Sequence, residues 1–239
     1  MASRKEQKEA LRREREARER AAKEAERRRR LLGYGTAGGL VAVALAVVVV
    51  LLLAGRGNGG TDRASATLLP DGGSVPDVKT TDLSQAAKAA GCEMKSFRAT
   101  SRGHTGNPNE KIRYSSNPPT SGKHYQFPAD DGAYGKAPHD TEVVHAEEHG
   151  RVIIWFKPSL PESTRADLKA LFDDQKGYQL LLVPRSNMSY QVAATAWNSA
   201  PEPLGTGRLL GCPSVKAETW DALQDFIEEN RGNGPEPVP

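Results

Sequence analysis

The sequence predicts an α+β fold with a small, mostly antiparallel sheet and a few packed helices, preceded by one transmembrane helix and a charged N-terminal helix. Two observations carry this prediction. Short apolar runs typical of strands occur in mixed order with segments whose apolar residues recur at helical spacing. Ahead of them stands an uncharged run long enough to cross a bilayer. A chain of 239 residues has room for one ordinary domain, at about residues 81–231, beside that extension.

The first 55 residues predict where the domain is located. Residues 1–30 are almost all Arg, Lys, Glu and Ala, and residues 31–55 contain no charged side chain. The apolar run exceeds the core of a signal peptide and lacks an Ala-x-Ala cleavage site, so we interpret it as an uncleaved transmembrane anchor. Basic residues before a span keep that end in the cytoplasm. We therefore expect a single-pass plasma-membrane protein with residues 1–30 cytoplasmic and the domain outside.

The expected partners follow from the same segments. The lipid bilayer is one, and the basic run reflects membrane orientation, so no nucleic acid is expected. A Gly-x-x-x-Gly pattern at residues 35–39 can support a homodimer through the transmembrane helix. Residues 56–80 are predicted to form a flexible linker and residues 232–239 a disordered tail, because both are rich in Gly, Pro and polar residues.

Local patterns predict the elements of the domain. Helices are expected at residues 83–90, with Thr81 or Asp82 as cap, at 161–175, with Ser159 as cap, and at 215–230, with Ser214 as cap. Strands are expected at residues 94–99, 111–114, 152–156, 178–183 and 191–197.

Two cysteines, Cys92 and Cys212, are the only ones in the chain. Outside the cytoplasm a pair of cysteines is more often bonded than free. Each follows a glycine, which permits close approach of the backbone. We predict a structural disulfide, which would stabilise the domain by about 4–5 kcal/mol in the chain-entropy account of so long a loop.

All five histidines fall between residues 104 and 149, and imidazole is a common metal ligand. His145 and His149 would lie roughly 6 Å apart on one helical face, but roughly 13 Å apart on a strand. Val143 and Val144 favour a strand, whereas Gly150 is a plausible helix end, and we favour a short helix followed by a strand. The predicted ligands of zinc or copper are His124, His145 and His149, with His104 and Glu147 as further candidates. Exposed or simply hydrogen-bonded histidines are the alternative.

Residues 145–149 also fit the pattern His-x-x-Glu-His of inverted zinc proteases. In that motif both histidines bind zinc and the glutamate activates water. A metal-assisted hydrolase with Glu148 as general base is therefore the alternative function. It requires a further acidic ligand, for which Glu228 and Glu229 are candidates.

Residues 117–125 form the other distinctive stretch, Asn-Pro-Pro-Thr-Ser-Gly-Lys-His-Tyr. Two prolines stiffen it and a glycine permits a turn. Its Ser-Gly-Lys lacks the spacing of a phosphate-binding loop. We expect a rigid loop that binds an unknown ligand and presents His124 beside the His145 segment; its residues are Pro118, Pro119, Thr120, Ser121, Gly122 and Tyr125, with Tyr134 as a further member.

Residues 117–125 and the Val-His-Ala-Glu-Glu-His-Gly-Arg-Val of residues 144–152, with Gly-Ala-Tyr at 132–134 between them, resemble the family called domain of unknown function 3105. Residues 90–92, 103–104 and 195–197 resemble its flanking motifs. The resemblance implies a membrane-anchored bacterial member of a family grouped with proteins similar to tumour protein p53-inducible protein 13, and no established activity. Glu147 stands where the family pattern implies an apolar residue. The expected function is a membrane-tethered binding module with a histidine-based metal site.

Overall fold

The computed structural model describes residues 68–236. The predicted cytoplasmic segment, the predicted span, most of the linker and residues 237–239 lie outside these residues. Within the described part of the chain, no helix is both long and apolar enough to cross a membrane.

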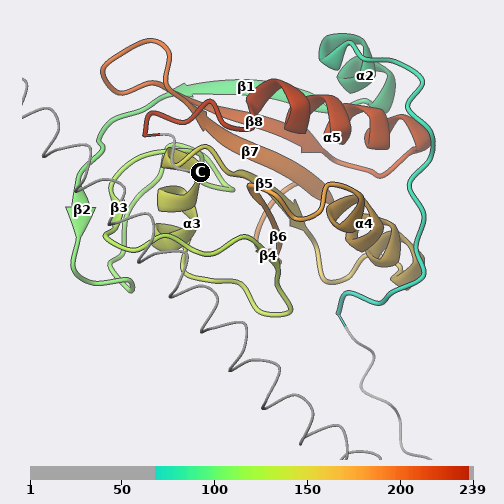
Figure 1. Cartoon of the computed structure of the whole chain (residues 1–239), viewed down its shortest axis with the longest axis horizontal. Coiled ribbons are helices and arrows are strands. Elements are labelled where there is room, and N and C mark those ends of the chain that lie inside the picture. Colours follow the sequence, from blue (N-terminus) through green and yellow to red (C-terminus); the bar gives the residue numbers. More distant parts are fainter. Residues whose placement is uncertain (1–67, 237–239) are drawn as a thin grey trace, which may run out of the picture. The chain divides into compact units, whose positions relative to one another are not determined.

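A six-stranded sheet forms the centre of the domain, in the order β1-β8-β7-β5-β6-β4 (Figure 1). The pairs β1–β8, β8–β7 and β7–β5 are antiparallel, whereas β6 runs parallel to both β5 and β4. The predicted α+β class with a mostly antiparallel sheet is thus confirmed. The strands are β1 (Glu93–Arg98), β4 (Gly132–Ala133), β5 (Val152–Phe156), β6 (Leu180–Pro184), β7 (Val192–Asn198) and β8 (Thr206–Cys212).

The helices cover both faces of this sheet. The first face carries α2 (Leu83–Ala90), α4 (Glu162–Asp174) and α5 (Ala217–Asn230), and the second carries α3 (Asp140–Glu148). Strand β5 shows that both faces of the sheet are buried. Ile154 and Phe156 belong to the core under α2, α4 and α5, while Ile153 and Trp155 pack on the α3 side. Successive side chains of a strand point to opposite faces, so a strand buried on both sides is apolar throughout.

Most predicted elements are present, but residues 111–114 do not form a strand. Two strands of the sheet, β4 and β8, were not predicted. Two glycines weaken the strand pattern of β8, and close packing requires both. A Cβ on Gly207 would lie 2.1 Å from the Thr120 hydroxyl oxygen, and one on Gly211 would lie 2.4 Å from the Tyr190 ring. Two cap predictions were also wrong, because the N-caps of α4 and α5 are Pro161 and Lys216.

The disulfide between Cys92 and Cys212 is confirmed, with the two Cα atoms 4.2 Å apart. It joins the residue after the turn that ends α2 to the last residue of β8. Gly91 ends α2 in the left-handed region, at φ 70°, and Asp82 caps its start by accepting a hydrogen bond from the Gln85 N–H. The bond therefore fastens the first helix of the domain to the sheet.

The described parts of the predicted linker and tail lie against the domain. Residues 56–80 were predicted to form a flexible linker, and three of them, Leu68, Leu69 and Val75, pack on the core under α2, α4 and α5. At the other end, the Gly232 N–H donates to the Gly150 carbonyl at 2.8 Å, and the Glu236 N–H donates to the Glu148 carbonyl at 3.0 Å. We call residues 232–236 the C-terminal strap. These contacts are long-range, so local composition did not reveal them.

Candidate metal centre

Helix α3 places the His145–His149 segment on the second face of the sheet. Residues 140–148 are helical, as favoured, and β5 follows directly. The N-cap of the helix is His139, and Gly150, at φ 85°, follows its C-terminal end. Val143 and Ala146 pack on the sheet. The helical spacing brings Nε2 of His145 within 3.1 Å of Nε2 of His149, a separation that a strand would not allow.

Two short strands add two more imidazoles from a different part of the chain. Strand β2 (His104–Thr105) pairs in parallel with β3 (His124–Tyr125), and the register sets His104 opposite His124. The ring of His124 lies 4.5 Å from that of His104 and 4.6 Å from that of His145, between centroids. One ligand atom each of His104, His124, His145 and Glu148 lies within 4.8 Å of the others. We call these four residues the histidine cluster.

Backbone carbonyls determine which nitrogen of two cluster rings carries the proton. Nδ1 of His124 lies 2.8 Å from the Gly122 carbonyl oxygen, and Nδ1 of His145 lies 2.6 Å from that of Tyr125. A carbonyl oxygen can only accept, so each Nδ1 is the donor. Burial, assisted by the nearby His124 and His149, lowers the pKa of His145 to about 4, so its Nε2 keeps a lone pair at neutral pH. Metal-binding histidines are commonly oriented in this way.

Glu148 supplies a buried carboxylate to the same group. Its Oε1 accepts from Arg102 Nε at 2.7 Å, and its Oε2 lies 3.0 Å from His124 Nε2. The second contact does not meet hydrogen-bond geometry, although both atoms are buried. Burial alone would raise the pKa of Glu148, but the contacts with His124 and Arg102 outweigh it and lower that pKa to about 2. The side chain is therefore an anion over the whole physiological range.

A second, smaller group adjoins the cluster through Glu148. It consists of Glu148, His149 and Glu236, and the last of these comes from the C-terminal strap. Arg102 already lies against both of its carboxylates, since its Nη2 donates to Glu236 Oε2 at 3.3 Å. A guanidinium thus supplies the positive charge that this group requires. Burial, followed by the nearby Arg151 charge, lowers the pKa of His149.

Glu147 belongs to neither group of candidate ligands, although the sequence made it a candidate. Its side chain is fully buried. The Thr195 hydroxyl, which accepts from the Trp155 indole at 2.8 Å, faces it without meeting hydrogen-bond geometry. Burial raises the pKa of Glu147 well above its usual range. Helical geometry separates Glu147 from Glu148 and its partners, because adjacent residues do not share a helix face.

The loop at residues 117–125 packs against the sheet. Its residues 118–122 are buried, whereas Asn117 is exposed and Lys123 and Tyr125 are partly exposed. Thr120 and Ser121 approach β8 so closely that residue 207 must be glycine. The loop therefore contributes by placing His124 and by offering the Gly122 and Tyr125 carbonyls to the two rings. The hydroxyl of Tyr134, the further predicted member, donates to the Asp130 carbonyl at 2.6 Å beside β4.

Two contributors were missed by sequence reasoning, namely Arg102 and Glu236. Arg102 lies two residues before His104, and Glu236 belongs to a Pro- and Gly-rich end, so neither carries a motif. The acidic candidates on α5 do not reach the cluster. Glu228 pairs with Arg231, and Glu229 lies 3.9 Å from Arg208.

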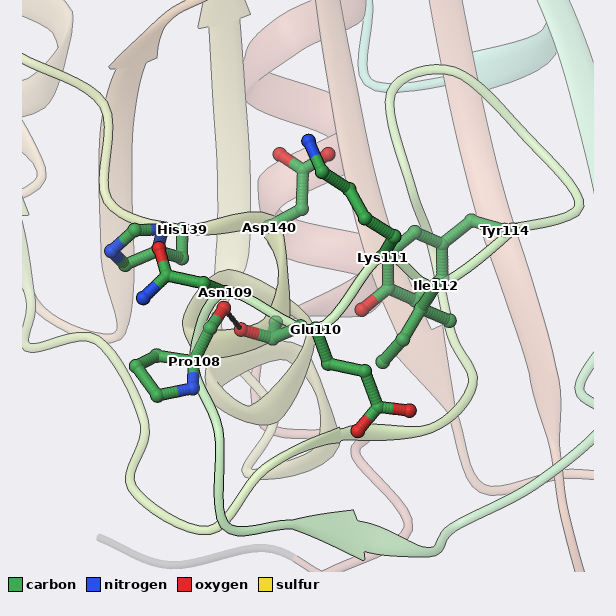
Figure 2. Close-up of a pocket in the computed structure, with 9 residues that line it drawn as sticks. Pro108, Asn109, Glu110, Lys111, Ile112, Tyr114, His139 and Asp140 are labelled. Carbon is green, nitrogen blue, oxygen red and sulfur yellow. Dashed lines mark hydrogen bonds between the residues drawn. The ribbon is translucent and has the colours of Figure 1, made fainter.

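The open pocket in Figure 2 is separate from the histidine cluster. It has a volume of about 330 Å³ and lies at the N-terminal end of α3, between residues 108–114 and 139–141. His139 is the histidine that it includes, and no residue of the cluster lines it. The Thr141 hydroxyl donates to the Pro108 carbonyl at 2.7 Å and ties the two walls together.

Together these features define an α+β domain with a candidate histidine–carboxylate metal centre. The chain matches the family described as a protein of unknown function, DUF3105, over residues 105–239. That match covers more than half of the chain, and the chain belongs to this family. It contains both distinctive stretches and begins after residues 90–92 and 103–104. No curated protein and no solved structure matches the chain.

Proposed function

We propose that this protein is a membrane-anchored domain outside the cell membrane that binds a transition-metal ion through the histidine cluster. The observation that carries the proposal is that one ligand atom each of His104, His124, His145 and Glu148 lies within 4.8 Å of the others. Within this cluster, His124 Nε2 and Glu148 Oε2 are buried 3.0 Å apart, and neither meets hydrogen-bond geometry with any partner. A metal ion bound to both atoms would satisfy them.

The donor set indicates the kind of ion. Three imidazole nitrogens and one carboxylate oxygen suit zinc or copper(II), whereas calcium and magnesium take oxygen ligands. Copper(I) prefers sulfur ligands, and both cysteines of the chain are in the disulfide. Membrane anchoring is supported by the uncharged run of residues 31–55 behind four consecutive arginines.

The alternative, a metal-assisted hydrolase with Glu148 as general base, has less support. An efficient general base has a pKa near the operating pH. The pKa of Glu148 is lowered to about 2, and Arg102 holds one of its two oxygens. Such a carboxylate is a good metal ligand and a poor base. A binding role for the site is the simpler interpretation.

Metal titration of the full-length, detergent-solubilised chain tests the proposal. We expect one zinc or copper(II) ion per chain by elemental analysis, and His145→Ala should weaken binding by at least about 10- to 100-fold, since it removes a ligand. His139→Ala is the matched control, because His139 is exposed, lies next to the same helix and is outside the cluster. A wild-type chain that takes up neither ion at micromolar concentration would refute the proposal.

A further inference from the structure

We propose that Arg102 is the positioning residue that makes Glu148 a one-oxygen ligand and thereby sets the metal preference of the cluster. This inference rests on the proposed function and names a determinant that lies outside the ligand set. It starts from the two oxygens of one carboxylate, which have different partners. Oε1 accepts from Arg102 Nε at 2.7 Å, and Oε2 faces His124 at 3.0 Å.

The ion pair between Arg102 and Glu148 is shielded from water and strong. The Glu148 side chain is 1% exposed and that of Arg102 is 33% exposed, so water competes little at the carboxylate. A charge-assisted contact of this length is among the stronger polar interactions in proteins. With Oε1 held by Arg102, only Oε2 is directed toward the ring nitrogens of the cluster. Glu148 is then restricted to binding the ion through a single oxygen.

The C-terminal strap holds Arg102 from its other side. Arg102 Nη2 donates to Glu236 Oε2 at 3.3 Å, and the backbone of Glu236 donates to the Glu148 carbonyl at 3.0 Å. Gly234 packs so closely that a Cβ there would lie 2.3 Å from the Glu148 carbonyl oxygen. The strap thus fastens the guanidinium relative to the end of α3. If Arg102 moved away from Glu148, it would also lose this contact with Glu236.

The coordination mode has a consequence for ion choice. Three imidazoles and one carboxylate oxygen make a four-coordinate site, which zinc favours in proteins. Manganese and calcium favour higher coordination numbers and more oxygen ligands. Releasing Glu148 so that both of its oxygens can bind should therefore weaken zinc binding and narrow the preference for zinc over manganese.

The test compares Arg102→Gln with wild type in the full-length chain, using zinc, manganese and cobalt(II) alone as probes. We expect zinc affinity to fall about 10- to 100-fold, as for other groups that orient a metal ligand. The visible spectrum of bound cobalt should change from the intense four-coordinate form to the weaker five-coordinate form. Arg113→Gln is the charge-matched control, because Arg113 is exposed and outside the cluster.

A second variant keeps the test decisive if Arg102→Gln fails to fold. Gly234→Ala should displace the strap and move zinc affinity and the cobalt spectrum in the same direction. Gly106→Ala is its control, since a Cβ there meets nothing within 4 Å. Unchanged affinity and an unchanged cobalt spectrum in Arg102→Gln would overturn the inference alone. A wild-type chain that binds no metal would overturn the proposed function and the inference with it.

Discussion

Glu147 and Glu148 are adjacent in the chain and both are buried, yet their carboxyls lie in opposite chemical environments. Glu148 faces the histidine cluster and Arg102, which lower its pKa to about 2. Glu147 faces the apolar side of α3, where burial raises its pKa well above the usual range. Burial without a cation neutralises a carboxyl, whereas burial beside a fixed cation keeps it ionised. One turn of helix therefore holds an ionised candidate ligand, Glu148, and a neutral core residue, Glu147, with the same side chain.

This contrast shows why a motif is insufficient to assign a role. The pattern His-x-x-Glu-His treats residue 148 as a base and leaves 147 free, but the surroundings decide the protonation state of each. On one face the partners come from residues 102, 104 and 124, and on the other from strands β5 and β7. Four experiments can break or sharpen the comparison.

The largest effect is expected for Glu148→Gln. Loss of the carboxylate should abolish detectable metal binding, because the amide is a weak ligand for zinc and copper(II). It also leaves Arg102 without its buried partner, which should lower the free energy of unfolding of the metal-free chain by about 1–3 kcal/mol. Chelator competition and chemical denaturation measure the two losses. Full metal affinity in this variant would show that Glu148 is not a ligand.

Glu147→Gln should have the opposite effect on stability. In wild type the folded state keeps Glu147 protonated, while the unfolded chain releases the proton above about pH 4.5. Folding must then take up a proton, so stability falls with rising pH by up to about 1.4 kcal/mol per pH unit above that value. The neutral amide removes this dependence, and the variant should melt higher than wild type at pH 8. Equal melting temperatures there would mean that the fold does not raise the pKa of Glu147.

His145→Gln tests, in the metal-free chain, whether the fold lowers the pKa of a residue on the cluster face. The pKa of His145 is lowered to about 4, whereas the unfolded chain protonates near its ordinary value of 6.5. The contribution of His145 to stability is therefore complete above about pH 6.5 and is lost as the pH falls toward 4. The variant should lack this loss, which melting curves between pH 4 and 7 measure. An identical acid profile in both proteins would contradict the lowered pKa.

The smallest effect is optical. The Trp197 ring lies 5.9 Å from the His124 ring, so copper(II) bound in the cluster should quench its fluorescence. Trp220 lies in the core on the other face of the sheet. Trp197→Phe should remove most of the quenching, and Trp220→Phe should leave it in place. Equal quenching in both variants would place the copper elsewhere.

Much of the local structure could be predicted from the sequence. Helical spacing and a capping aspartate indicated α2, five consecutive apolar residues indicated β5, and the two cysteines indicated the disulfide. The clustering of histidines also indicated which part of the chain carries the candidate site. The helix and the strand depend on neighbouring residues. The disulfide could be predicted because the chain has only two cysteines, which leaves one possible pair.

Only the tertiary structure decided what the histidines and glutamates face. It placed His104 opposite His124, directed two Nδ1 atoms at backbone carbonyls, turned Glu147 into the core, and brought Arg102 and Glu236 to Glu148. Arg102 lies 46 residues before Glu148 and 134 before Glu236. Protonation states depend on such distant partners, because a pKa responds to the charges and the burial around a group in space, whatever their separation along the chain.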